Sequence, residues 1–306
     1  MNCLGYKQSV EEGRLNNKDK VFIKIKGLYT GTMDEEASFD GEEAEVIESQ
    51  DDEVEVINVG TYSVVNGKEY IDLSAGIAVN VFGVCDDVWQ KAVIDQLGKL
   101  SHMSNVFYTE PQIVLAKKIC EKTGMKKVFF SNSGAETNEC AIKAARKYSH
   151  DKYGDGRYTI ITLKNSFHGR TMATLTACGQ DSLHQDFGPF LPGFVYAEPD
   201  NFESVKKLAE ENKTCAIMME LVQGVHPLNP DFVHQVADYA KAHDILLIID
   251  EVQTGNGRTG ALYAYMRYGI QPDIVTTAKA IGGGLPFAVT MFADSCQHAL
   301  TDHTHG

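Results

Sequence analysis

The sequence has little that would suggest a membrane-spanning or disulfide-bonded protein. Among its 306 residues no apolar run reaches the ~18 residues that a membrane span needs. The first residues also lack the apolar stretch of a signal peptide. The seven cysteines are scattered without paired spacing, which argues against a disulfide framework and against a zinc site. We therefore expect a cytoplasmic chain with reduced thiols, no membrane partner and no bound metal.

Positive charge is missing from residues 34–55, which hold 12 acids and no lysine or arginine. Removing these acids from the net charge of −14 leaves the rest of the chain at only −2. The acidity therefore belongs to one segment, and nucleic-acid binding gets no support. We expect residues 1–58 to form a divergent, poorly ordered acidic segment. It is either an interaction tail or, as we favour, a sequence that does not belong to the ancestral fold.

Residues 59–306 read as one large α/β domain, because strands and helices alternate along them. This order predicts a mainly parallel central sheet that is covered by helices on both faces. Residues 64–73 should form a hairpin around Asn66-Gly67. The remaining predicted strands are 127–131, 158–164, 215–220, 245–250 and 273–276, and the predicted helices are 87–100, 111–121, 135–150, 231–243 and one that opens after Gly169.

The most informative pair of residues is Asp250 and Lys279, which lie 29 residues apart. Asp250 ends an apolar strand, and Lys279 follows a second strand just before a run of three glycines. A lysine that forms a Schiff base, with an acid that pairs with the pyridinium nitrogen, is how a protein holds pyridoxal 5'-phosphate. An isolated lysine near a loop is usually a solvated surface residue, but these surroundings favour the cofactor. We therefore predict Lys279 as the catalytic residue, acting as a neutral amine whose pKa is lowered by its surroundings.

The segment Ser133-Gly134-Ala135 precedes a predicted helix. Small residues there let backbone N–H groups approach a phosphate, and the helix dipole favours the negative charge. An ordinary helix cap by Ser133 is the alternative. Because the predicted ligand carries a phosphate, we assign Ser133, Gly134 and Ala135 to cofactor binding. Ligands on such sheets bind beyond the carboxyl ends of strands, and all the residues assigned so far lie near predicted strand ends.

Four segments in the same order resemble the class III aminotransferases, namely residues 129–139, 166–171, 250–255 and 276–286. Residues 70–80 and 104–109 resemble the acetylornithine aminotransferase branch of that family. The resemblance runs from about Gly60 to the last residue. It implies the large domain of fold-type I pyridoxal phosphate enzymes, and a homodimer.

The resemblance also implies roles for single residues. Phe167 would lie against one face of the pyridine ring, Val252 against the other, and Gln253 would reach the ring hydroxyl. Arg170 is the candidate clamp for a substrate carboxylate, since its planar fork binds carboxylates at two points. Glu220 is the second candidate for substrate binding. His168 is left with a structural role.

Three departures from the family pattern bear on activity. The chain stops where the family continues into a C-terminal domain, which supplies an arginine for the substrate carboxylate. Residues 220–227 resemble a family segment with three residues deleted, including a glutamate that pairs with that arginine. The N-terminal segment that contacts substrate in the family has no recognisable counterpart.

Two other motifs are set aside. Residues 255–260 match G-x-G-x-x-G, but a dinucleotide site should turn directly from strand into helix, whereas residues 250–254 separate this strand from the glycines. The polar tail 302–306 could suggest a metal, but such groups at a chain end are usually solvated. Neither motif changes the interpretation.

The function implied by this resemblance is transfer of an amino group from N-acetylornithine, or a related ω-amino donor, to 2-oxoglutarate in arginine biosynthesis. The alternative is a truncated, catalytically impaired remnant, or a module that binds the cofactor without turnover.

Overall fold

The computed structural model describes residues 23–25, 44–46, 62–65, 68–71, 75–83, 86–104 and 106–305. Contacts divide the chain into two units, one of Met1–Leu73 with Gly83–Asp87 and one of Ser74–Phe82 with Val88–Gly306. In the first unit β1 (Ile23–Ile25) pairs antiparallel with β2 (Ala44–Val46), and β3 (Tyr62–Val65) pairs antiparallel with β4 (Lys68–Ile71). The β3–β4 pair has Val65 opposite Lys68, so the predicted hairpin has a two-residue connection. Apart from β1 and β2, the segment predicted to be poorly ordered lies outside the described residues.

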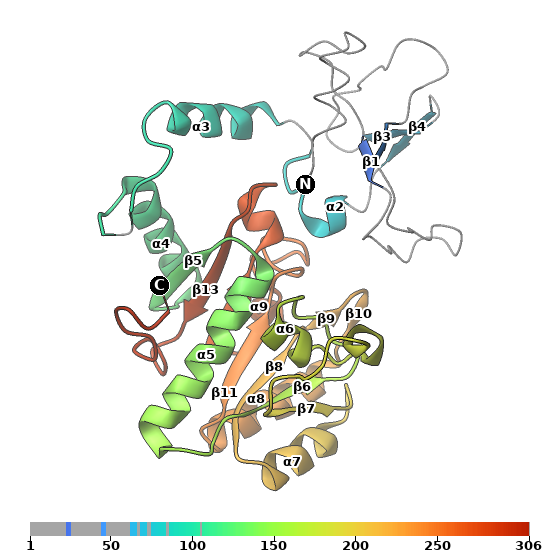
Figure 1. Cartoon of the computed structure of the whole chain (residues 1–306), viewed down its shortest axis with the longest axis vertical. Helices are drawn as coiled ribbons and strands as arrows, with labels where there is room; N and C mark the ends of the chain where they lie inside the picture. Colours follow the sequence, from blue (N-terminus) through green and yellow to red (C-terminus); the bar gives the residue numbers. More distant parts are fainter. Residues whose placement is uncertain are drawn as a thin grey trace. The chain divides into compact units, whose positions relative to one another are not determined.

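The second unit is built on a seven-stranded sheet (Figure 1). Four of its neighbouring strand pairs are parallel, while β13 runs antiparallel to both of its neighbours. The prediction of a mainly parallel sheet is therefore confirmed. In spatial order the strands are β5 (Lys127–Ser131), β13 (Ala288–Phe292), β12 (Ile274–Thr277), β11 (Leu246–Asp250), β8 (Thr214–Met219), β6 (Thr159–Leu163) and β7 (Phe194–Ala197).

Helices cover both faces of this sheet, as predicted (Figure 1). The helices α5 (Gly134–Tyr153) and α6 (Met172–Ala177) pack on one face, and α7 (Phe202–Glu211) and α8 (Pro230–Ala242) pack on the other. The other elements are α2 (Ala75–Ala78), α3 (Asp87–Leu97), α4 (Glu110–Thr123), α9 (Ala264–Tyr268), the 3₁₀ helices η1 (Asp181–His184) and η2 (Lys279–Gly282), and the short hairpin of β9 (Val222–Gln223) and β10 (His226–Pro227). Among the described helices, none is long and apolar enough to cross a membrane.

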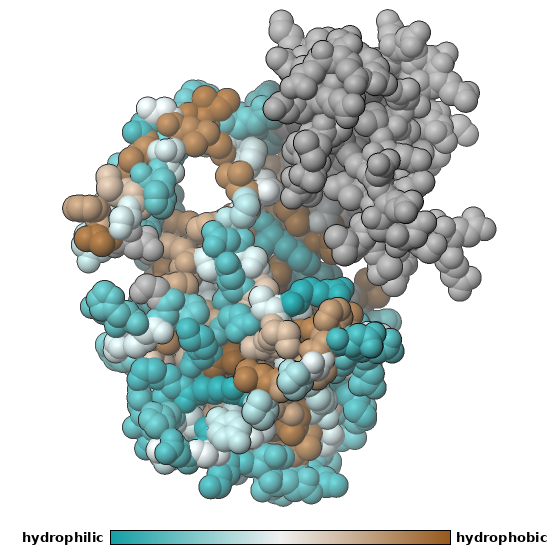
Figure 2. Space-filling view, viewed as in Figure 1, coloured by the Kyte–Doolittle hydropathy of each residue, from teal (hydrophilic) through white to brown (hydrophobic). Residues whose placement is uncertain are grey.

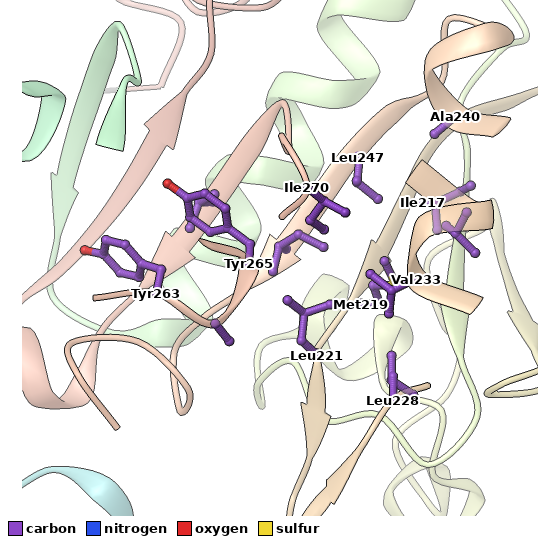
Figure 3. Packing of buried hydrophobic residues seen from close by; sticks show 14 of the residues in the cluster. Ile217, Met219, Leu221, Leu228, Val233, Ala240, Leu247, Tyr263, Tyr265 and Ile270 are labelled. Atoms are coloured by element: carbon purple, nitrogen blue, oxygen red, sulfur yellow. The ribbon is translucent and has the colours of Figure 1, made fainter. Parts of the chain in front are cut away.

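The central strands are buried on both faces, which explains their continuous apolar sequences. Alternate residues enter opposite cores: Ile248 packs into the cluster beneath α5, and Ile249 into the cluster beneath α8. Figure 3 shows the second cluster, where Val233 of α8 lies near Met219 of β8. Burying each such side chain stabilises the fold by roughly 1.5–3 kcal/mol. The two cores hold the sheet rigid, so its carboxyl edge provides a fixed platform for a site.

Gly179 occupies a place where no side chain fits. A Cβ atom on this residue would lie 2.0 Å from the main-chain oxygen of Leu163, at the end of β6. We expect Gly179→Ala to lower the free energy of unfolding by about 2 kcal/mol or more, because backbone atoms cannot move aside cheaply. Urea unfolding measures this loss. The matched control is Gly98→Ala, whose Cβ would make only ordinary contacts at 3.6 Å; equal stability of the two variants would contradict the prediction.

Candidate active site

The residues predicted for the site come together at one edge of the sheet. β5 runs in the same direction as the parallel strands, because two antiparallel steps through β13 restore the direction. The carboxyl ends of β5, β6, β8, β11 and β12 therefore lie at the same edge. Every predicted site residue belongs to a segment that follows or ends one of these five strands.

Asp250 is the most constrained residue of this edge. It is 4% exposed, at the last position of β11. Its Oδ2 accepts hydrogen bonds from Asn138 Nδ2 at 2.7 Å and from His168 Nδ1 at 2.8 Å. Its Oδ1 accepts one from the backbone N–H of Val252 at 3.0 Å. A carboxylate can accept about four hydrogen bonds, so Asp250 has capacity for one more donor.

His168 pairs with Asp250 in full burial, since its side chain is 0% exposed. Burial alone would lower the pKa of His168, but the carboxylates of Asp250 and Glu220 together raise it. Its Nε2 is buried without a hydrogen-bond partner among the described residues. The His168 ring therefore holds one oxygen of the Asp250 carboxylate in a fixed direction at the end of β11.

Lys279 begins η2 with a left-handed backbone, at φ +51°. Its Nζ donates to Gln253 Oε1 at 3.2 Å, and Gln253 Nε2 in turn donates to the main-chain oxygen of Gly224 at 3.2 Å. Burial lowers the pKa of Lys279, although Asp250 and Glu220 oppose this shift. The direction is the one that a nucleophilic amine requires.

The N-terminus of α5 borders the site at one end. Ser133 caps the helix through a capping box, accepting from Glu136 N at 3.3 Å while its own N–H donates to Glu136 at 3.1 Å. The backbone N–H groups of Gly134 and Ala135 have no acceptor within the part of the chain that the structure describes. A Cβ on Gly134 would lie 2.8 Å from Val252 Cγ1, so only glycine lets the two segments approach. Both predicted readings of Ser133, helix cap and anion-site border, are compatible with this geometry.

Phe167, Arg170 and Glu220 form the third group. Phe167 is 42% exposed, and the Arg170 guanidinium carbon lies 5.5 Å from the centre of its ring. The Arg170 side chain is exposed, which leaves it available to an anion. Glu220 is only 8% exposed, and its Oε2 accepts from the backbone N–H of Phe167 at 2.8 Å.

Sequence reasoning missed the part played by Asn138. Its Nδ2 donates to Asp250 and to the main-chain oxygen of His168 at 2.8 Å, while its Oδ1 accepts from Thr276 at 2.7 Å. It therefore joins α5 to β11, β12 and the loop after β6. The available signal was an amide side chain among the mostly small and apolar residues of a predicted helix, and Asn138 is in fact only 1% exposed. His168, which was given a structural role, is the other member of this network.

The glycine-rich motif at residues 255–260 leads into turns, and the next helix, α9, begins only at Ala264. A dinucleotide fingerprint needs a direct strand-to-helix turn, so this segment lacks the required context. Among the described residues, no group of three or more His, Cys, Asp or Glu side chains could hold a metal ion.

Comparison with known proteins decides the family. Residues 57–306 match the family described as aminotransferase class-III. The chain belongs to that family. Its cofactor is pyridoxal phosphate, as the sequence predicts. The fold-type I architecture is likewise confirmed, since solved aminotransferases share the fold.

Individual relatives agree with this assignment. The chain is 51% identical over 244 residues to the acetylornithine aminotransferase of Haemophilus ducreyi, covering 79% of this chain and 62% of that relative. It is 46% identical over 243 residues to a succinylornithine transaminase of Salmonella paratyphi B, covering 78% and 59%. The solved N-acetylornithine aminotransferase of Stenotrophomonas maltophilia has 32% identity and a TM-score of 0.67, covering 80% of this chain and 65% of that one. The chain thus spans about three fifths of the length of its curated relatives.

The residues present fit pyridoxal phosphate. The Lys279 amine has a lowered pKa, Asp250 retains capacity for one donor, and two helix N–H groups are open to a phosphate. Gly134 packs closely against Val252 and has no Cβ, so no side chain at this position covers the N–H groups at the start of α5. These features join a nucleophile, a buried anion and an anion site, the three groups that the cofactor requires.

Titration of Glu220 should be visible in the stability of the protein. Burial raises the pKa of Glu220 to about 7, while His168 opposes the rise and Asp250 adds to it. The folded state therefore binds more protons than the unfolded state between the ordinary glutamate pKa of about 4.3 and the folded value. The contribution of Glu220 to the free energy of unfolding therefore falls as the pH rises through this window.

We expect Glu220→Gln to flatten that pH profile, because glutamine does not titrate. Urea unfolding at half-unit steps from pH 4.5 to 8 measures the slope. The exposed Glu203→Gln, on α7, is the control and should keep the wild-type slope. Parallel profiles for wild type and Glu220→Gln would show that the carboxyl group titrates normally.

Proposed function

We propose that this chain binds pyridoxal 5'-phosphate and transfers an amino group from N-acetylornithine, or a related ω-amino donor, to 2-oxoglutarate. The observation that carries the proposal is the Lys279 amine, which is half-buried, has a lowered pKa and hydrogen-bonds to Gln253 next to the Asp250 strand end. The names of the relatives support the donor class and a role in arginine biosynthesis. The scattered free cysteines support a cytoplasmic location.

The cofactor would supply an electron sink that stabilises negative charge on the carbon that bears the donor's amino group. Lys279 Nζ is the group that would attach the cofactor, and as a neutral amine it would then take and return the α-proton of the donor. Asp250 would pair with the protonated ring nitrogen, because His168 and Asn138 orient its carboxylate. The N–H groups of Gly134 and Ala135 would bind the phosphate, with Ser133 at the edge of the same turn.

The remaining predicted residues would shape the site around these groups. Phe167 and Val252 would enclose the ring, and Gln253 would exchange its bond to Lys279 for one to the ring hydroxyl. Arg170, exposed beside Phe167, would bind a substrate carboxylate through its planar fork. Glu220, the second residue predicted to bind substrate, meets this side of the site through its hydrogen bond to the Phe167 main chain, and its role is proposed below from that bond.

A second candidate function is retention of the cofactor without turnover. It is favoured by the short β9–β10 hairpin, whose tip carries Val225, an aliphatic residue 82% exposed, rather than an acid. Binding and turnover are therefore measured separately.

The first test is the visible spectrum of the purified chain with pyridoxal phosphate. We expect an absorption band that Lys279→Ala removes, because only a covalently held cofactor shifts into that range. The matched control, Lys241→Ala on the exposed side of α8, should retain it. Bleaching of the band by acetylornithine supports the first function, and a stable band supports the second. A chain that gives no Lys279-dependent band has neither function.

We further propose that the chain forms a homodimer through the surface around α3. No residue of α3 is buried among the described residues. Its side chains Ile94 and Leu97, 66% and 60% exposed, lie three residues apart and hence on adjoining positions of the helix. The neighbouring Val106, Phe107 and Tyr108 are 82%, 60% and 90% exposed. Figure 2 shows apolar side chains gathered where Figure 1 places α3, and a surface of this kind usually binds another protein.

Sedimentation velocity tests the dimer. We expect wild type to sediment as a dimer at micromolar concentration and Ile94→Glu with Leu97→Glu to sediment as a monomer, because two charges would have to be buried. Lys91→Glu, on the same helix and already exposed, should remain dimeric. A wild-type chain that stays monomeric at high concentration, or a double variant that still dimerises, would contradict the proposal.

A further inference from the structure

Glu220 is a buried acid whose surroundings do not neutralise it. It directly follows β8 and is 8% exposed. Within the described residues no Lys, Arg or His nitrogen lies at ion-pair distance from its carboxylate, and the bond from Phe167 N–H is its one recorded hydrogen bond. Burying a carboxylate with so little compensation is costly. The stability of the fold alone therefore does not account for this side chain.

Its hydrogen bond fixes one particular point of the main chain. Phe167 lies in the loop between β6 and α6, and its N–H donates to Glu220 Oε2 at 2.8 Å. The next N–H, of His168, donates to Cys178 Sγ at 3.2 Å, and the His168 ring is held by Asp250. Two successive peptide groups are thus anchored in the interior, while the Phe167 ring stays 42% exposed. Anchoring the backbone on the inner side is what allows a partly exposed aromatic ring to keep a fixed direction.

The charged groups around Glu220 come from each neighbouring element. His168 belongs to the loop after β6, Asp250 ends β11, and Lys279 follows β12. His168 and Lys279 favour the charged form of Glu220, whereas burial and Asp250 disfavour it. Both forms of the acid keep an oxygen that can accept from Phe167 N–H, so the anchor survives titration.

A substrate contact would place different demands on this side chain. An acid that binds a substrate must present a free oxygen to the open part of the site, as the exposed Arg170 presents its guanidinium. Glu220 is instead only 8% exposed, and the one hydrogen bond of its carboxylate among the described residues is accepted by Oε2 from the main chain of Phe167, which leaves Oε1 for the Gln variant to test. We infer that Glu220 is a positioning residue: it accepts the Phe167 N–H and so holds the Phe167 ring in place against the ligand, without itself touching substrate. This role rests on the proposed function only in one respect, namely that the Phe167 ring lies against a bound cofactor.

The test compares Glu220→Gln, which keeps an acceptor oxygen and loses the charge, with Glu220→Leu, which has similar size and no acceptor. The first readout is amide hydrogen exchange of Phe167 in the cofactor-free chain. We expect exchange about tenfold faster in the Leu variant and within about threefold of wild type in the Gln variant. Asp273→Asn is the matched control. Its carboxylate accepts from Leu247 N–H at 2.8 Å at the opposite edge of the sheet, so this variant should leave Phe167 unchanged.

The second readout is binding, followed by visible absorption. In the Leu variant we expect the Kd for pyridoxal phosphate to rise about tenfold. The Phe167 ring would no longer be held in place, so binding would have to pay the conformational entropy of ordering it. In the Gln variant we expect wild-type affinity for both cofactor and acetylornithine. Weaker acetylornithine binding in the Gln variant with unchanged Phe167 exchange would overturn the inference, because it would make Glu220 a substrate contact. Unchanged exchange in the Leu variant would overturn it as well.

The two readouts separate this inference from the proposed function. If the wild-type chain fails to bind pyridoxal phosphate, the proposed function fails, while amide exchange still decides whether Glu220 holds Phe167. Circular dichroism checks that each variant folds. If the Leu variant does not fold, Glu220→Asp replaces it, because a carboxylate one methylene shorter cannot reach the Phe167 N–H in the same backbone.

Discussion

The site depends on one buried carboxylate. Asp250 ends β11 beneath the protein surface, and three donors from separate parts of the chain converge on it. Two of them, Asn138 and His168, come from α5 and from the loop after β6. Burying a carboxylate without such partners is costly. The same bonds that hold the Asp250 side chain therefore fix α5, β6 and β11 at mutual positions that suit a cationic ring.

The sequence predicted most of the fold because the central strands are short, apolar and bounded by clear helix signals. Strand 127–131 has the observed bounds, and helix 231–243 is displaced by one residue at each end. The strands β7 and β13 were missed. β13, Ala288–Phe292, follows a glycine- and proline-containing loop, and its antiparallel direction cannot be read from residue periodicity. Its pairing is set by tertiary contacts on both sides.

For the site, strand-end position and motif spacing were enough to bring Ser133, Phe167, Asp250 and Lys279 together at one edge. They could not show how these residues are held. Asn138 is one of several buried polar residues of α5, and only the fold reveals that its amide joins Asp250, His168 and Thr276. The backbone bond from Phe167 to Glu220 spans 53 positions and leaves no trace in sequence spacing. Any residue except proline can donate a main-chain N–H, so the identity of residue 167 does not reveal this hydrogen bond.

The reversed strand β13 links the two ends of the site. Its first residue, Ala288, pairs with Ser131, just before the helix that carries the open N–H groups, and its second, Val289, pairs with Thr277, just before Lys279. The register of β13 with β5 and β12 therefore sets the distance between the anion-binding turn and the Lys279 amine. A slip of one residue in β13 would also turn its buried side chains to the wrong face, so the core opposes it. The sheet therefore holds the two ends of the site at a set separation that does not depend on a bound ligand.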